Sequence, residues 1–132
     1  MTRQFLIIGV IGLFGAFGAV SRYAVGVTVF RWLGEGFAYG TLVVNVLGCF
    51  LLALLAHLGT TTDLVSPELR LVLGVGFLGA FTTFSTFGYE TLTYLEDGDW
   101  VLAAANVVAN LVFGLVAVWA GLTLARYVYG GA

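Results

Sequence analysis

Four long apolar segments dominate the chain, and short stretches between them hold most of the charged residues. The segments run from about residue 5 to 30, 39 to 58, 71 to 95 and 100 to 127. Each matches or exceeds the roughly 20 residues that an α-helix needs to cross a bilayer. The pattern therefore predicts an all-α membrane protein, a single domain over residues 1–132 with four transmembrane helices.

The composition agrees with an apolar solvent. Of the 132 residues, 61% are hydrophobic and 9% are charged, whereas a soluble domain carries about 25% charged residues. So few charges cannot cover a water-facing surface, so we expect a multi-pass protein of the cell membrane in contact with lipid. The net charge of −2 comes without a basic patch, so no nucleic-acid partner is expected.

The start of the chain resembles a signal peptide, because Arg3 precedes an apolar run. That run continues past Ser21 and Arg22 to Phe30 without reaching a polar region. We therefore interpret it as the first membrane helix.

The arginines between the segments bear on how the helices insert. Four helices place both ends on one side of the membrane, the side of Arg3, Arg70 and Arg126. Arg31 lies on the opposite side, with Arg22 near the same end of its helix. The positive-inside rule favours cytoplasmic termini, but a bias of three against one or two is nearly balanced. Insertion in both orientations, giving an antiparallel dimer, is a hypothesis that follows from this balance.

Small residues at helical spacing indicate close helix packing, which is how helices associate in lipid. One stripe in the first segment comprises Gly9, Gly12, Ala16 and Ala19, and one in the fourth comprises Asn106, Asn110, Gly114, Ala117 and Gly121. We expect both stripes to lie against other helices. Gly74, Gly76 and Gly79 spell G-x-G-x-x-G, but inside an apolar segment and not between a strand and a helix, so they do not indicate a dinucleotide site.

Polar side chains at membrane depth are costly and are therefore functional candidates. Those within the segments are Arg22, Asn45, Thr82, Thr83, Ser85, Thr86, Glu90, Asn106 and Asn110. His57, near the end of its segment, is expected to reach water and to be structural. Cys49 is interpreted as a small packing residue.

The densest cluster is Gly79-Ala80-Phe81-Thr82-Thr83-Phe84-Ser85-Thr86-Phe87. Hydroxyls can satisfy backbone groups where a helix breaks, so a break in the third helix is predicted beside the glycine. Carbonyls freed by a break can bind a hard cation such as Na⁺. Phe84 and Phe87 share a helix face, and the edge of a phenyl ring is its positive part. Together with Asn45, Asn110 and the hydroxyls, these rings would attract a small anion without trapping it.

Four motifs occur in order along the chain. They are Gly15-x-x-Gly18-Ala19-x-x-Arg22-Tyr23, Gly40-Thr41-Leu42-x-x-Asn45-x-x-Gly48-x-Phe50, Gly76-Phe77-x-Gly79-x-x-Thr82-Thr83-Phe84-Ser85-Thr86-Phe87-x-x-Glu90 and Asn106-x-x-x-Asn110-x-x-x-Gly114. The set resembles the helix motifs of the Fluc/CrcB fluoride channels at nearly full length, and the third motif resembles its counterpart almost letter for letter.

The resemblance implies a fluoride-selective channel that exports fluoride passively and relieves its toxicity. It implies a dual-topology dimer with two pores, either a homodimer or a heterodimer with a related chain. A structural, untransported Na⁺ at the dimer centre would be held by the backbone carbonyls of Gly79 and Thr82. The implied pore residues are Asn45, Phe84, Ser85, Thr86, Phe87 and Asn110, with Arg22, Glu90 and Asn106 as possible pore or vestibule residues. Two departures are Ala80, where a second glycine is frequent, and Asn106, where some members carry tyrosine.

Two other functions compete with a channel. A proton-coupled exporter of cationic drugs needs an acid deep in a span, but the first segment has no Asp or Glu and Glu90 lies among hydroxyls and phenylalanines. A non-transporting membrane subunit explains the glycine stripes but not the cluster of hydroxyls and phenyl rings. No nucleophile–base pair or metal triad supports an enzyme.

Overall fold

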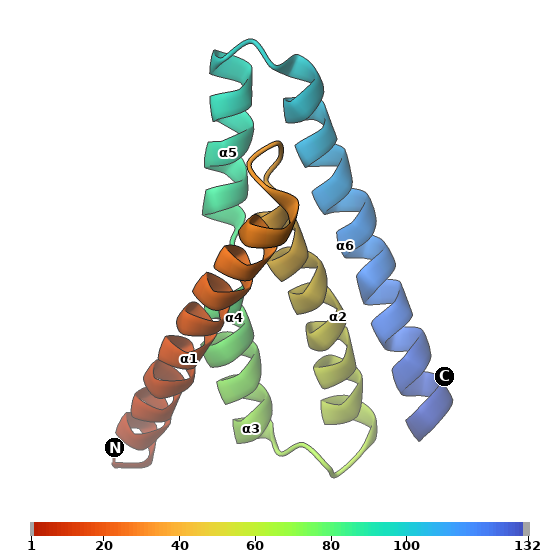
Figure 1. Ribbon diagram of the computed structural model, residues 1–132. Coiled ribbons are helices and arrows are strands. Elements are labelled where there is room, and N and C mark those ends of the chain that lie inside the picture. Colours follow the sequence, from red (N-terminus) through yellow and green to blue (C-terminus); the bar gives the residue numbers. More distant parts are fainter. Residues whose placement is uncertain (1, 131–132) are drawn as a thin grey trace.

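The computed structural model describes residues 2–130 as four long helical spans (Figure 1). The helices are α1 (Thr2–Leu33), α2 (Tyr39–Thr61), α3 (Pro67–Leu71), the π-helical segment η1 (Val72–Leu78), α4 (Gly79–Phe81), α5 (Phe84–Glu96) and α6 (Trp100–Tyr129). The third span comprises α3, η1, α4 and α5. By length and composition all four spans can cross a membrane, which confirms the predicted fold class, and the helices extend a few residues beyond the predicted bounds.

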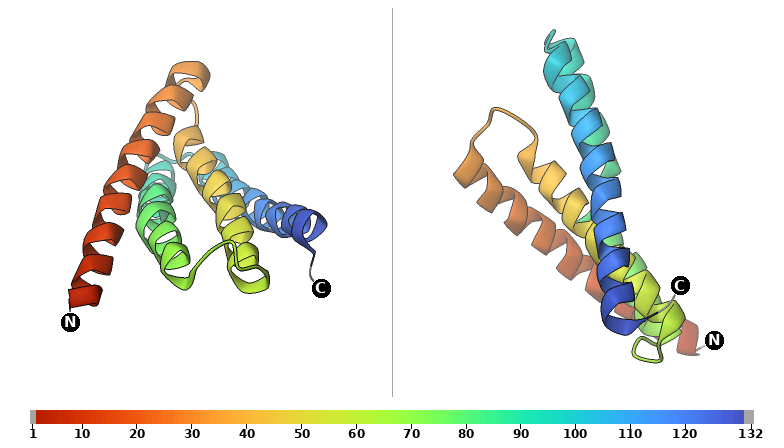
Figure 2. Two further views of the ribbon diagram at one scale, coloured as in Figure 1. Left: turned by 90° about the horizontal axis from the view of Figure 1, so that it is seen from below. Right: turned by 90° about the vertical axis from the view of Figure 1, so that its right-hand side faces the viewer.

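The helices are arranged so that α1 begins at the lower left of Figure 1 and α6 ends at the lower right, while α5 and α6 form a hairpin that rises at the top. Viewed from below, α1, α3, α2 and α6 follow one another across the molecule (Figure 2, left). The most extensive packing joins α2 to α6 and α1 to η1.

The two stripes of small residues behave differently. In α6, Gly114, Ala117 and Gly121 are buried, and a Cβ on Gly114 would lie 3.5 Å from the sulfur of Cys49 in α2. In α1, Gly9 and Gly12 have no neighbour within 4 Å, so this stripe is not covered within the described chain. The helix packs instead through Gly18, where an added Cβ would overlap the carbonyl of Phe77.

The third span breaks at Thr82 and Thr83, where the backbone is extended (φ −82°, ψ 161° and φ −151°, ψ 110°). Gly79 itself stays right-handed helical (φ −63°, ψ −32°), so the break is three residues further along than the glycine suggested. Two interactions hold it there. The Thr83 side chain caps α5 by accepting from the Thr86 N–H at 3.2 Å, and Gly48 of α2 leaves room for the Thr82 methyl group.

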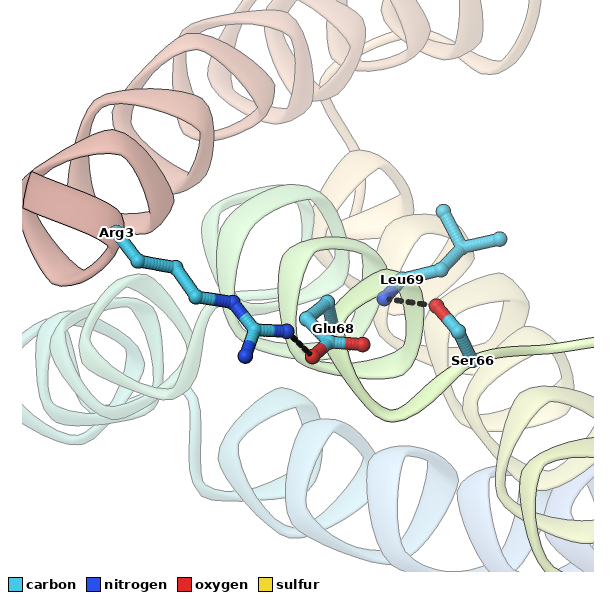
Figure 3. A network of polar contacts seen from close by, with 4 residues as sticks. All are labelled: Arg3, Ser66, Glu68 and Leu69. Atoms are coloured by element: carbon cyan, nitrogen blue, oxygen red, sulfur yellow. Dashed lines mark hydrogen bonds and ion pairs between the residues drawn. The ribbon is translucent and has the colours of Figure 1, made fainter.

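The ends of the helices are fixed by polar contacts near one face of the membrane. Ser66 caps α3 by accepting from the Leu69 N–H at 3.2 Å, and Arg3 pairs with Glu68, which ties α1 to α3 (Figure 3). His57 is buried and its Nε2 lies 2.9 Å from the Gly130 carbonyl oxygen. The expectation that His57 reaches water is wrong, because the end of α6 covers it.

Candidate functional site

The break takes the helical donors away from the carbonyl oxygens of Gly79 and Thr82, among others. In a continuous α-helix each C=O accepts from the N–H four residues later. The Thr83 N–H would then donate to the Gly79 carbonyl, and the Thr86 N–H would donate to the Thr82 carbonyl. Here the Thr83 N–H donates to Asn45 Oδ1 at 2.8 Å, and the Thr86 N–H donates to Thr83 Oγ1 at 3.2 Å. The Gly79 and Thr82 carbonyls are therefore without their helical donors, and such oxygens suit Na⁺.

The family resemblance named these two carbonyls as cation ligands, and that role stays a prediction. Among the described residues no group of three or more His, Cys, Asp or Glu side chains could hold a metal ion. A cation at the break would consequently depend on main-chain oxygens, and the donor set fits a hard, weakly held ion better than a transition metal.

A cavity of about 330 Å³ lies beside the break, and we call it the phenylalanine cavity. Its wall includes Asn45, Thr82, Phe84, Phe87 and Asn110. The two phenyl centroids are 5.5 Å apart with the rings tilted by 53°, so their edges are not hidden by face-to-face stacking. Of the six pore residues that the resemblance implied, the structure gathers Asn45, Phe84, Phe87 and Asn110 around this cavity.

The asparagine amides in this wall are already committed to the protein. Asn45 Nδ2 donates to the Thr83 carbonyl at 3.2 Å and to Asn110 Oδ1 at 3.0 Å. Asn110 Nδ2 donates to the backbone oxygen and to Oδ1 of Asn106 at 3.0 and 3.1 Å. Each amide nitrogen therefore has two protein acceptors within hydrogen-bond distance, as many as it has hydrogens.

A second cavity of about 560 Å³, the glutamate cavity, is lined by Arg22, Thr41, Thr86 and Glu90 among others. The Thr41 hydroxyl donates to Glu90 Oε1 at 2.7 Å, while Glu90 Oε2 is buried without a partner among residues 2–130. A buried, unpartnered carboxylate oxygen is costly. Glu90 Oε2 is therefore a polar group of the glutamate cavity that the described chain leaves without a hydrogen bond.

Two further groups of the glutamate cavity are free to act on an anion. Thr86 Oγ1 accepts from the Thr83 hydroxyl at 2.8 Å, and its own hydrogen has no acceptor among the described residues. Arg22 forms no ion pair within this part of the chain, where Arg3 and Glu68 make the only one. A charge on the wall of a cleft raises the local concentration of the opposite ion, so Arg22 would draw anions towards Thr86.

Thr83 lines both cavities, so the two are adjacent at the break. Of the predicted site residues, Ser85 and Asn106 line neither, and Asn106 is fully buried. Sequence reasoning named Thr83 only as one hydroxyl of the cluster and Thr41 only within a motif. For Thr83 a further signal was available, because threonine is a favoured N-cap residue at the start of a helix.

Adjacent cavities lined by phenyl edges, uncharged donors and one arginine, inside four membrane-spanning helices, define a multi-pass membrane protein suited to a small ion. The chain belongs to the CrcB family. The family model described as "CrcB-like protein, Camphor Resistance (CrcB)" matches residues 9–122.

Relatives agree with this assignment. The chain is 47% identical over 108 residues to a protein of Geobacter metallireducens named fluoride-specific ion channel FluC, covering 82% of this chain and 87% of the relative. The protein of that name in Geobacter sulfurreducens is 50% identical over 107 residues (81% and 86%), and that of Geotalea daltonii is 46% identical over 118 residues (89% and 95%). These relatives are named as channels and not as enzymes or drug exporters, which confirms the predicted family and the non-enzymatic class.

Proposed function

We propose that this protein is a fluoride-selective channel that lets fluoride leave the cell passively and so relieves its toxicity. The observation that carries the proposal is the adjacency, at Thr83, of the glutamate cavity and the phenylalanine cavity. The identity of the ion is inferred from the relatives, which are named as fluoride-specific channels. Fluoride is small and strongly hydrated, so a pathway must replace its water with several weak donors.

In this pathway Arg22 attracts the anion, and the free Thr86 hydroxyl donates to it in the glutamate cavity. Past Thr83, the edges of Phe84 and Phe87 assist it in the phenylalanine cavity. Ser85 is the nearest further hydroxyl, with its Oγ 3.5 Å from Thr83 Oγ1. None of these groups except Arg22 carries a charge, so the ion is attracted without being trapped.

The working form is an antiparallel dimer of two copies, or of this chain with a related one. Two features of the single chain support it. The Gly9 and Gly12 stripe of α1 is open, and Phe84 is 83% exposed although it borders the phenylalanine cavity. A second copy packed here would cover both.

The same dimer would hold a structural Na⁺ at its centre. Each chain offers two carbonyls, from Gly79 and Thr82, and a second copy would double the oxygen set. Because the ligands are main-chain atoms, Thr82→Ser should leave flux nearly unchanged, whereas replacing Na⁺ with N-methylglucamine should impair assembly or flux. Full flux without Na⁺ would remove the ion from the proposal.

The function is tested with purified protein in liposomes. Vesicles are loaded with equal concentrations of potassium fluoride and potassium chloride, and valinomycin is added while ion-selective electrodes record each anion outside. We expect fluoride efflux far above chloride efflux, and neither in protein-free vesicles. Equal efflux of the two anions would contradict a fluoride channel.

A further inference from the structure

A chain of hydrogen bonds connects the break to three helices, and every bond in it points the same way. The bonds run from Thr83 N to Asn45 Oδ1 (2.8 Å), from Asn45 Nδ2 to Asn110 Oδ1 (3.0 Å), from Asn110 Nδ2 to Asn106 Oδ1 (3.1 Å), from Asn106 Nδ2 to Thr91 Oγ1 (2.9 Å) and from Thr91 Oγ1 to the Phe87 carbonyl (2.8 Å). We call the four side chains of Asn45, Asn110, Asn106 and Thr91 the asparagine relay.

The direction of the relay is set at the break. A backbone N–H can only donate, so the Thr83 N–H requires the oxygen of Asn45 to face it. The amide nitrogen of Asn45 must then face Asn110, whose oxygen accepts, and the same constraint passes to Asn106. Aligned hydrogen bonds of this kind strengthen one another, so the relay has one favoured arrangement.

The relay starts and ends on the segment that carries the pore phenylalanines. Its first bond holds the Thr83 N–H and its last reaches the carbonyl of Phe87, while the intervening amides belong to α2 and α6. Asn106 has no exposed surface, and neither Asn106 nor Thr91 lines either cavity. The far half of the relay is therefore out of reach of an ion in these cavities.

We propose that the asparagine relay is a positioning device for conduction, and that Thr91 and Asn106 are positioning residues that act through Asn110 and Asn45. By keeping the Thr83 N–H on Asn45, the relay keeps it off the Gly79 carbonyl and holds the break open. It also sets the direction of the first turn of α5, and so of Phe84 and Phe87. This inference rests on the proposed fluoride pathway.

The sharpest variant is Thr91→Val, which removes one hydroxyl of the relay and changes no residue of either cavity wall. Thr91→Ser keeps the hydroxyl and is the conservative rescue. Thr123→Val is the matched control, because the Thr123 hydroxyl bonds only the Trp119 carbonyl of its own helix at 2.8 Å. For each variant we measure fluoride efflux from liposomes, the elution volume on size exclusion, and the ¹⁵N side-chain amide resonances of Asn45.

We expect Thr91→Val to elute as the native protein does and to lose about tenfold in fluoride efflux, within the range found for mutations along coupled networks. The Asn45 amide resonances should shift, although Asn45 is three relay bonds away. Thr91→Ser should restore both, and Thr123→Val should change neither. A merely structural threonine would not move the Asn45 resonances. Native efflux in Thr91→Val, or equal loss in Thr91→Ser, would overturn the proposal.

If Thr91→Val does not fold, the double variant Thr91→Val with Asn106→Leu replaces both partners by apolar groups, which is far less costly than leaving one unpaired. Asn110 keeps its bond to the Asn106 backbone oxygen in this variant. A folded double variant with low efflux supports the relay, and one with native efflux overturns it. If the native protein carries no fluoride, the proposed function fails, while the Asn45 resonances still report whether the relay exists.

Discussion

Two neighbouring regions, one built from the second, third and fourth spans and one from the third span alone, treat their polar groups in opposite ways. In the asparagine relay each amide oxygen accepts a hydrogen bond and each amide nitrogen donates one within the described chain. Close to the relay, four polar groups between Gly79 and Glu90 lack the partner that would satisfy them within the described chain. This free set, which we call the break wall, comprises the Gly79 and Thr82 carbonyls, the Thr86 hydroxyl and Glu90 Oε2.

The difference distinguishes structure from transport. In lipid an unpaired polar group costs several kcal/mol, roughly, so helices are selected to pair such groups wherever function does not require otherwise. Both regions are rich in polar residues and the sequence gives them equal weight. Only the hydrogen bonds distinguish the two regions. The amide groups of the relay bond acceptors within the protein, whereas the groups of the break wall lack such partners and are available to an ion.

The largest effect is expected at Asn45, where the two regions meet. Asn45→Asp places a negative charge on the wall of the phenylalanine cavity and removes the donor to Asn110. Fluoride would then pass a like charge, a repulsion of about 4 kcal/mol at ~4 Å and an effective dielectric constant of about 20, so fluoride efflux should fall about a hundredfold or more at about tenfold per 1.4 kcal/mol. Size exclusion should show an assembled protein. Native efflux from an assembled Asp variant would place Asn45 outside both the pore and the relay.

Next come the rings of the phenylalanine cavity. Phe84→Leu and Phe87→Leu each remove a ring whose positive edge assists the anion, and we take the energy of an aromatic pair, about 0.5–1.5 kcal/mol, as the scale of that electrostatic contact. Each should lower fluoride efflux by up to about tenfold while leaving the protein folded, with a native elution volume on size exclusion. Phe113→Leu is the control, because Phe113 is exposed on α6 and lines neither described cavity. If both Leu variants conduct as the control does, the rings have no part in the pathway.

Thr86 tests the break wall by itself. Thr86→Val removes a free hydroxyl donor at nearly constant volume, and a neutral hydrogen bond contributes about 0.5–1.5 kcal/mol. Fluoride efflux should fall about fivefold, with Thr86→Ser close to native, as measured in the same liposome assay. The Asn45 resonances should stay in place, because Thr86 is outside the relay. A shift there would show that the two regions are not independent.

The smallest effect is expected for Arg22→Lys. Arg22 donates no hydrogen bond within the described residues, so its charge should matter more than its shape. Lysine should keep fluoride efflux within about twofold of native, whereas Arg22→Gln should lower it most at low ionic strength, where surface charges are least screened. A loss of assembly with lysine would instead show that the guanidinium group is structural.

Much of this architecture could be predicted from the sequence. The apolar segments set the four spans, and the hydroxyl cluster indicated a break in the third. The position of the break was missed by three residues, because Thr83 decides it, through its capping bond and the bond from its N–H to Asn45, and Gly79 does not. The Gly79 and Thr82 carbonyls were named through resemblance to a family, and their binding of a cation stays a prediction.

The bonding of the asparagines could not be predicted. Spacing placed Asn106 and Asn110 one helical turn apart and suggested donors for an anion. Their partners come from α2 and α5, at sequence separations of 65 for Asn110 with Asn45 and 15 for Asn106 with Thr91. No local pattern in the sequence encodes which acceptor each amide hydrogen bonds. The open stripe of α1 is a similar case, since its neighbour is not in the described chain.

The most direct test of the contrast between the two regions is a fluoride titration followed by NMR. The side-chain amide resonances of Asn45 and Asn110 are recorded together with the backbone amide of Thr86, in Na⁺ buffer, as chloride is exchanged for fluoride. We predict a saturable shift at Thr86 and none at the two asparagines, because their amide hydrogens stay within the relay. A saturable downfield shift of the asparagine amides, with Thr86 unmoved, would show that the anion binds the relay and would contradict the account.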